Sequence, residues 1–164
     1  NTKDSLMQLF KNPILWSNRS QVTGKLIQVD IAKSQIKGFR LDGKALLIQQ
    51  VDSIHANKFN QLAGKKLEGF LSSDTLRKVT VKGSAEILYY PKNKNKLMGL
   101  DQTTCDEIFM WFKNGEIDRI SLKPLSVGKI DPLNTVDVEN AKLKGFNWQY
   151  DKRPKSRFEI RAKN

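Results

Sequence analysis

The chain repeats part of itself with a spacing of 40 residues. The segment SQVTGK at residues 20–25 recurs as NQLAGK at residues 60–65, and the alignment then continues without gaps to Ala45 and Ala85. Matched apolar positions, rather than identities, carry this alignment. A repeat of this length indicates stacked units that bury one another's apolar faces, because one unit alone cannot enclose a core.

A third and weaker copy begins at residue 101, and it has Pro124 where the first two copies have Gly43 and Gly83. The copies therefore lie near residues 20–50, 60–90 and 101–122. Three units are too few to close a propeller, which typically needs four or more blades. We therefore expect an all-β fold with little helix: an open, solenoid-like stack of antiparallel strands in a double sheet.

Alternation of apolar and polar residues indicates half-buried strands within each copy. The clearest hairpin spans residues 107–122, where Asn114-Gly115 suits a two-residue turn with positive backbone angles. The apolar phase changes between Ile117 and Ile120, which predicts a bulge. Glycine inside the second strand of the first two copies (Gly43 and Gly83) predicts a bend that takes a long strand from one sheet to the facing one.

The remaining segments are less regular. We expect loops at residues 90–96 and 122–134, a short helix at residues 136–143, and a basic tail at residues 151–164 outside a single domain of residues 1–150. That tail is expected to be disordered or held against the outside of the domain.

Charge is the main clue from composition to a partner. The 164 residues carry a net charge of +12, which indicates an anionic partner or surface. The sequence holds no apolar run long enough to cross a bilayer as a helix, and its start does not resemble a signal peptide. If the protein is exported, we therefore expect that its signal was removed or lies outside this sequence. A single cysteine suits cytoplasm or periplasm and rules out an intrachain disulfide.

No catalytic or metal-binding constellation stands out in the sequence. His55 is the only histidine and is interpreted as structural or surface-exposed, while Cys105 is interpreted as a small buried apolar residue rather than a nucleophile. The carboxylates show no pairing by spacing, and Gly24-Lys25 lacks the remainder of a phosphate-binding loop. We therefore expect no enzyme activity, no cofactor and no metal.

One aligned apolar face is a candidate lining for a lipid groove, although on sequence alone a filled core is the favoured interpretation of the same residues. It consists of Ile27, Val29, Ile31, Phe39, Leu41, Leu67, Leu71, Val79, Val81, Ile108, Met110 and Phe112.

The positive charge also raises nucleic-acid binding as an alternative. Phe59, Phe70, Tyr89 and Tyr90 would then act as stacking platforms among lysines and arginines. The sequence lacks a helix-turn-helix pattern, a zinc knuckle and an RRM signature, so nucleic acid is not the expected partner. A structural module that only pairs edge strands with partner proteins is a further alternative.

Several motifs in the right order carry a family resemblance. NPILW at residues 12–16 followed by QVTG at 21–24, NQLAGK at 60–65, VKGSAEILYY at 81–90, and LKGFNW at 143–148 with RPKS at 153–156 resemble OstA-like proteins of the LptA-like lipopolysaccharide-transport family. The resemblance covers roughly residues 5–160. Ser84 departs from the family's usual asparagine.

The resemblance implies a fold and a function. It implies a V-shaped double sheet, the β-jellyroll or "β-taco", whose apolar groove holds the acyl chains of lipopolysaccharide or lipid A. It implies end-to-end pairing through edge strands with like domains, copies of itself included. It also implies a periplasmic bridging role in outer-membrane biogenesis.

Overall fold

The computed structural model describes residues 4–124 and 128–155, and these are built almost wholly from β-strands. The described residues contain no α-helix, so the predicted all-β class is confirmed. The strands are β1 (Ser5–Leu9), β2 (Ile14–Ser17), β3 (Ser20–Thr23), β4 (Leu26–Ala32), β5 (Gln35–Gln50), β6 (Phe59–Ser72), β7 (Thr75–Tyr89), β8 (Lys92–Asn93), β9 (Lys96–Leu97), β10 (Leu100–Lys113), β11 (Glu116–Lys123) and β12 (Lys129–Asp131), with 3-10 helices η1 (Leu133–Thr135) and η2 (Tyr150–Lys152).

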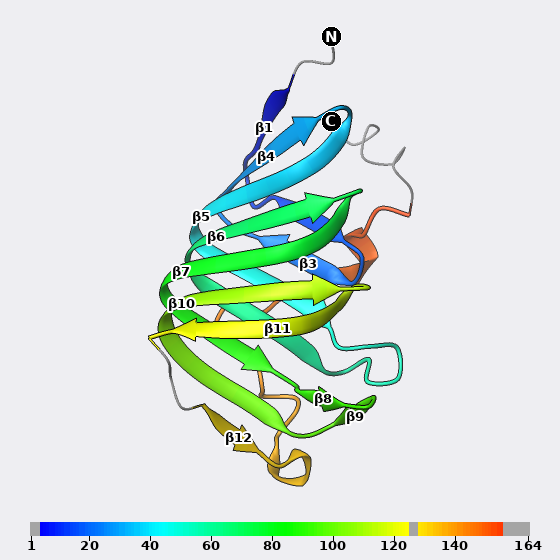
Figure 1. Cartoon of the computed structure of the whole chain (residues 1–164), viewed down its shortest axis with the longest axis vertical. Helices are drawn as coiled ribbons and strands as arrows, with labels where there is room; N and C mark the ends of the chain where they lie inside the picture. The colour runs from blue at the N-terminus through cyan, green and yellow to red at the C-terminus, as the bar shows by residue number, and fades with distance from the viewer. Residues whose placement is uncertain (1–3, 125–127, 156–164) are drawn as a thin grey trace.

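A single antiparallel sheet contains ten of these strands (Figure 1), in the order β1-β4-β5-β6-β7-β10-β11. The first half of β5 pairs with β4, whereas its second half pairs with β3. Strand β2 pairs with β3, and β12 pairs with the start of β10. Strands β8 and β9 form a separate small hairpin.

Three hairpins of the ten-stranded sheet share one turn geometry, and the separate β8–β9 hairpin has it too, at Lys94–Asn95 (φ 46° and 66°). The predicted hairpin at Asn114-Gly115 is confirmed, and two others in the same sheet have the same pair of positive φ angles. Two-residue turns of this kind match the twist of the strands, and they impose positive φ even where no glycine is present. The turns are Lys33–Ser34 (φ 50° and 61°), Ser73–Asp74 (51° and 56°) and Asn114–Gly115 (51° and 78°).

The predicted bulge on the return strand of the last hairpin is also confirmed. Trp111 pairs with Arg119 but Phe112 pairs with Ile117, so Asp118 is the extra residue. The bulge explains the change of apolar phase in the sequence, because an unpaired residue turns each later side chain to the other face.

Glycine marks a second irregularity in the middle of the long strands. Gly43 and Gly83 have φ of 73° and 79°, and the β5–β6 register shifts between Asp42 and Ala45. The register shifts between β5 and β6 and between β6 and β7 confirm an irregularity at these glycines, and the long strands are strongly curved (Figure 1). Each is thereby divided into two halves.

These halves define two layers. The hairpin layer contains β4, β11 and the halves of β5, β6, β7 and β10 next to the three hairpin turns. The covered layer contains β2, β3, β12 and the other halves of the same long strands. Residues of both layers meet in one apolar cluster, since Phe39 and Leu41 come from the hairpin layer and Leu47 from the covered layer.

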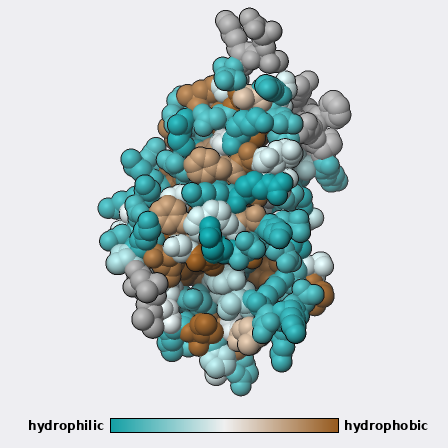
Figure 2. All heavy atoms as spheres, viewed as in Figure 1, coloured by the Kyte–Doolittle hydropathy of each residue, from teal (hydrophilic) through white to brown (hydrophobic). Residues whose placement is uncertain are grey.

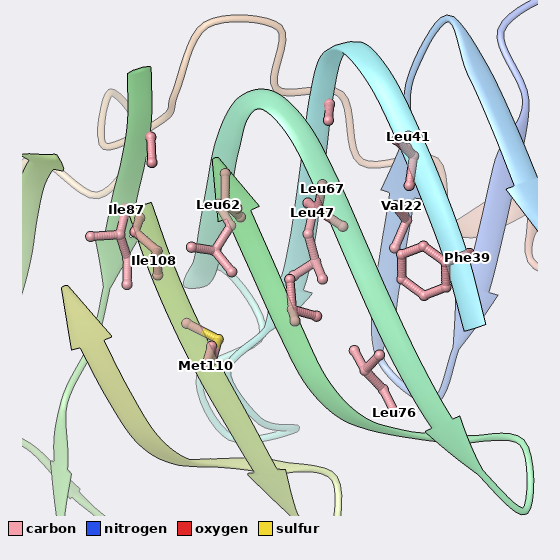
Figure 3. Close-up of a cluster of buried hydrophobic side chains, with 14 of the residues drawn as sticks. Val22, Phe39, Leu41, Leu47, Leu62, Leu67, Leu76, Ile87, Ile108 and Met110 are labelled. Carbon is pink, nitrogen blue, oxygen red and sulfur yellow. The ribbon is translucent and has the colours of Figure 1, made fainter. Parts of the chain in front are cut away.

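Two apolar cores lie on opposite faces of the sheet. The inner core lies between the layers (Figure 3) and consists of Val22, Ile27, Val29, Phe39, Leu41, Ala45, Leu47, Leu62, Leu67, Leu76, Val79, Val81, Ala85, Ile87, Ile108, Met110 and Phe112. The outer core lies on the far face of the covered layer, under the C-terminal segment (residues 133–153). It consists of Leu46, Ile48, Val51, Leu88, Tyr90, Leu97, Leu100 and Leu143.

Three predictions about irregular segments are wrong. Residues 90–96 contain the β8–β9 hairpin rather than only a loop, and residues 122–134 include β12 and part of η1. The predicted helix at residues 136–143 is absent, because the side chain of Asp137 bonds both the backbone and the side chain of Asn140 in a turn. Such local bonds compete with helix formation. Most of the predicted basic tail lies outside the described residues.

Candidate functional site

The structure gathers the twelve predicted lining residues in one place, the inner core. Ten of them are buried, and Ile31 and Leu71 are half-buried at its margin. The alternation along β4, β5, β6, β7 and β10 thus points one apolar row of each strand inwards (Figure 3). Their contact with a lipid remains a prediction.

The inner core is packed with side chains. A β-carbon added to Gly69 would lie 2.1 Å from Cζ of Phe39, and one added to Gly64 would lie 2.4 Å from Cγ1 of Val81. Glycine is needed at these positions because the facing side chains lie directly against the backbone. An acyl chain would therefore have to displace side chains or separate the two layers.

The tip of the β10–β11 hairpin joins the hairpin layer to the covered layer. Nε2 of Gln49 donates to the Gly115 carbonyl at 3.1 Å, and the Glu116 carboxylate lies 3.4 Å from Nζ of Lys92 and 3.9 Å from Arg19. We call this line of contacts the seam. It joins the β10–β11 hairpin tip to Gln49 of β5, to Lys92 of β8 and to Arg19 in the β2–β3 turn.

A charged cluster supports the covered-layer side of the seam. The Asp52 carboxylate lies 2.8 Å from Nζ of Lys92 and 2.8 Å from Nδ1 of His55. Burial alone would raise the pKa of Asp52, but the hydrogen bonds from Lys92 and His55 outweigh it and hold that pKa well below its usual range. His55 therefore anchors the loop after β5.

Two cavities flank the hairpin tip. The first, about 420 Å³, is lined by Asn18, Arg19, Thr75, Arg77, Asn114 and Gly115. The second, about 300 Å³, is lined by Gln49, Val51, Asn60, Tyr89, Tyr90, Lys92, Lys94, Asn95, Glu116, Ile117 and Asp118. Both are polar, and neither is lined by the twelve predicted residues. Sequence reasoning missed the first set, since its members are scattered among turn residues that occupy such positions for backbone reasons.

Cys105 is half-buried beside the inner core. Its Sγ lies 3.3 Å from the Glu107 carbonyl. Burial raises the pKa of its thiol, so the thiol stays protonated and poorly nucleophilic at neutral pH. Cys105 packs against the apolar core, as the sequence predicted, but it is half-buried rather than buried.

Two buried glutamines hold the C-terminal segment on the covered layer. Gln21 donates to the Asn147 carbonyl and accepts from the Gln149 amide, at 2.8 Å each. Gln61 donates to the Ala141 carbonyl at 3.1 Å and accepts from the Leu143 amide at 2.7 Å. The recurrence of glutamine in SQVTGK and NQLAGK was a sequence signal for this role.

Aromatic side chains complete the cover. The Trp16 and Trp148 rings lie 5.1 Å apart, and those of Phe59 and Phe146 lie 5.2 Å apart. Of the four residues considered as nucleic-acid stacking platforms, Tyr90 is in the outer core, Phe59 packs against it and Tyr89 packs against the inner core. Only Phe70 among these four is exposed, at 47%. The four do not form a common platform.

The outer face of the hairpin layer combines cations with aromatic rings. Nζ of Lys78 lies 5.4–5.9 Å from the ring centres of Phe70, Phe109 and Trp111, and the Arg119 guanidinium lies 3.9 Å from that of Trp111. This face is mostly hydrophilic, with scattered apolar groups (Figure 2). These cations and rings therefore stabilise one another through cation–π contacts.

The described residues offer neither a metal site nor a membrane-spanning helix. Among residues 4–124 and 128–155, no three His, Cys, Asp or Glu side chains form a group suited to a metal ion. Within the same residues, no helix has the length and apolar character needed to span a bilayer.

Comparison with known proteins gives no relative. No family model, no curated protein and no solved structure matches the chain.

Proposed function

We propose that this chain is a lipid-binding domain of the lipopolysaccharide-transport type, which holds acyl chains between its two layers. The observation that carries the proposal is the inner core, to which β3, β4, β5, β6, β7 and β10 all contribute and which collects all twelve aligned apolar residues in it or at its margin. The residues that form this core are uniformly apolar, so a lipid within it would meet no polar anchor. Such an interior permits sliding without a fixed register.

The proposal includes a repeat-built, V-shaped double sheet of the β-taco kind. The positive-φ turns at Lys33–Ser34, Ser73–Asp74 and Asn114–Gly115 recur at spacings matching the sequence alignment, as do the glycine bends at Gly43 and Gly83. Shared turns and bends at matched positions are expected of repeated units that stack on one another. The glycine bends would form the closed side of the V.

Energetics favour an acyl ligand once the layers separate. Each buried methylene contributes roughly 0.8 kcal/mol, so a chain of about a dozen carbons supplies ample gross affinity. The two ion pairs of the seam, Arg19–Glu116 and Lys92–Glu116, add little resistance to opening, because they involve partly exposed groups and exposed pairs contribute about 0–1 kcal/mol each. We therefore infer that lipid enters through the seam.

The end strands suit end-to-end assembly. β1 and β11 are the terminal strands of the sheet order, and each pairs on one side only among the described residues. Leu6 of β1 and the adjacent Phe10 are 53% and 62% exposed. Unpaired edges readily accept a strand from another chain. We propose like domains as partners, in a periplasmic bridge towards the outer membrane.

A paramagnetic acyl chain tests lipid entry. Fatty acid carrying a nitroxide near its methyl end is titrated into protein with labelled Ile, Leu and Val methyl groups. Methyl signals of the inner core, such as Val29 and Val81, should broaden saturably. Methyl signals of the outer core, such as Ile48 and Leu88, provide a matched control within the same molecule. No broadening, or equal broadening of both cores, would overturn the proposal.

A structural module is the second candidate function. The packed contact of Phe39 with Gly69 and the terminal positions of β1 and β11 favour a scaffold that only pairs edges. In that case the chain would form edge-mediated oligomers whose stability does not change with added lipid. Sedimentation of the protein with and without lipopolysaccharide distinguishes the two functions.

A further inference from the structure

We propose that the first cavity beside the seam is a binding site for a phosphate group carried on a small ring or headgroup. It has a volume of about 420 Å³ and is lined by Asn18, Arg19, Thr75, Arg77, Asn114 and Gly115. Three separate segments build it: the β2–β3 turn, the start of β7 and the β10–β11 turn.

The donors around the cavity match a phosphate. Asn18 and Asn114 carry amide N–H groups, Thr75 carries a hydroxyl, and Arg19 and Arg77 carry guanidinium forks; no lining residue is acidic. Arginine bonds phosphate oxygens in pairs, which gives both strength and orientation. A ring of donors with two fixed positive charges favours a small anion of high charge.

The arginines are available to a ligand. Within the described part of the chain, Arg77 makes no ion pair, and Arg19 has one long contact, 3.9 Å from Glu116. A phosphate held by both arginines would therefore displace little existing interaction.

A bulge places Arg77 at the cavity. Leu71 pairs with Leu76 but Phe70 pairs with Lys78, so Arg77 is the extra residue of the β6–β7 hairpin. An unpaired residue of this kind turns its side chain away from the regular alternation. Gly115, at the tip of the facing β10–β11 hairpin, has a φ of 78° and also lines the cavity. Because glycine has no side chain, it does not fill the cavity from that side.

Size and position indicate the class of ligand. Ligand sites commonly occupy about 300–1,000 Å³, so this cavity has room for a phosphate with one attached ring. It lies beside the seam, where the headgroup of a lipid would sit if its acyl chains occupied the inner core. That last link rests on the proposed function, whereas the phosphate site itself rests on the lining residues.

Binding of inorganic phosphate and glucose 1-phosphate tests the site. Each is titrated into the isotope-labelled protein at constant ionic strength, and side-chain signals of Asn18, Asn114 and the arginines are followed, with glucose as the uncharged control. Saturable shifts confined to these signals are expected with both phosphates and not with glucose. Uniform, non-saturating shifts across basic side chains would overturn the proposal.

Charge-matched variants separate a built site from general attraction. Arg77→Gln should weaken glucose 1-phosphate binding about tenfold or more, and Arg77→Lys should weaken it less, since one point charge replaces a two-pronged contact. Lys144→Gln removes one charge from an exposed residue that does not line the cavity and should change affinity less than about twofold. Equal losses of glucose 1-phosphate affinity in Arg77→Gln and Lys144→Gln would overturn the proposed site.

A phosphate lipid distinguishes this site from the proposed function. A single-chain lysophosphatidate, used below its micelle concentration, should bind more tightly than glucose 1-phosphate if the inner core also receives acyl chain. Equal affinity of the two ligands, with no inner-core broadening, keeps the phosphate site and removes the acyl function. Inner-core broadening without any effect of Arg77→Gln keeps the acyl function and removes the phosphate site.

Discussion

Gln21 and Gln61 lie in one row across the covered layer, on either side of Ile48. Both are 1% exposed, and each both donates to and accepts from the backbone of the C-terminal segment. Buried amides are stable only when their polar groups are paired. The two side chains therefore attach this segment to the sheet and close the outer core.

Loss of Gln61 should loosen the C-terminal segment. Gln61→Ala leaves the Ala141 carbonyl and the buried Leu143 amide without their partner, and we expect a loss of about 1–3 kcal/mol in the free energy of unfolding. Urea unfolding measures the loss, and hydrogen exchange at the Leu143 amide should become faster.

Gln102 offers a matched control, because it occupies the corresponding place in the third sequence copy but is exposed. The free energy of unfolding of Gln102→Ala should stay within about 0.5 kcal/mol of that of the parent. Similar losses for the two variants would contradict the role assigned to Gln61.

Contact between Phe39 and Gly69 should couple the two positions. Gly69→Ala forces the Phe39 ring to move, and overpacking of this kind costs about 1–3 kcal/mol of stability. Phe39→Leu in the same background should recover part of this loss. A double-mutant cycle from urea unfolding measures the coupling, and strictly additive effects would show that the ring does not lie against Gly69.

Acid should weaken the cluster around Asp52. The pKa of Asp52 is lowered in the folded protein, so its ionised form stabilises the fold above the ordinary aspartate pKa near 4, and this contribution disappears as pH falls through the folded value. Asp52→Asn should lower the free energy of unfolding by about 1–2 kcal/mol at pH 7. This difference in stability between the variant and the parent should become smaller below about pH 4.

Thermal unfolding between pH 7 and pH 2 checks this dependence. Asp42→Asn is the control, because the exposed Asp42 has a 4.0 Å contact with exposed Lys66. It should shift stability by less than about 0.5 kcal/mol at pH 7. A constant gap between Asp52→Asn and the parent at every pH would exclude the proposed linkage.

Weakening the seam should speed lipid entry if the proposed function holds. Glu116→Gln removes the ion pairs with Arg19 and Lys92, which stabilise the closed seam by up to about 1 kcal/mol. We therefore expect the rate of fluorescent fatty-acid uptake to rise about two- to fivefold. Stopped-flow fluorescence measures this rate. Asp131→Asn breaks the ion pair with Lys129, away from the seam, and should leave the rate unchanged. An unchanged rate in Glu116→Gln would argue against entry through the seam.

Local features of the fold were predictable because they depend on neighbours in sequence. Asn114-Gly115 specified its turn, the phase change after Ile117 revealed a bulge, and alternation along each strand separated inward from outward residues. All twelve apolar residues chosen from the alignment lie in or against one core. The helix expected at residues 136–143 failed because the side chain of Asp137 forms a turn with Asn140 instead.

Only the tertiary structure decided how these strands enclose space. The sequence showed which residues share a face, but a lining and a filled core have the same pattern. Packing of Phe39 on Gly69 shows that the interior is filled at this point, and the bond from Gln49 to Gly115 shows that the two layers meet at the β10–β11 turn. The cavity between Arg19 and Arg77 likewise depends on side chains from segments far apart in the chain, whose approach is set by sheet curvature and not by local sequence.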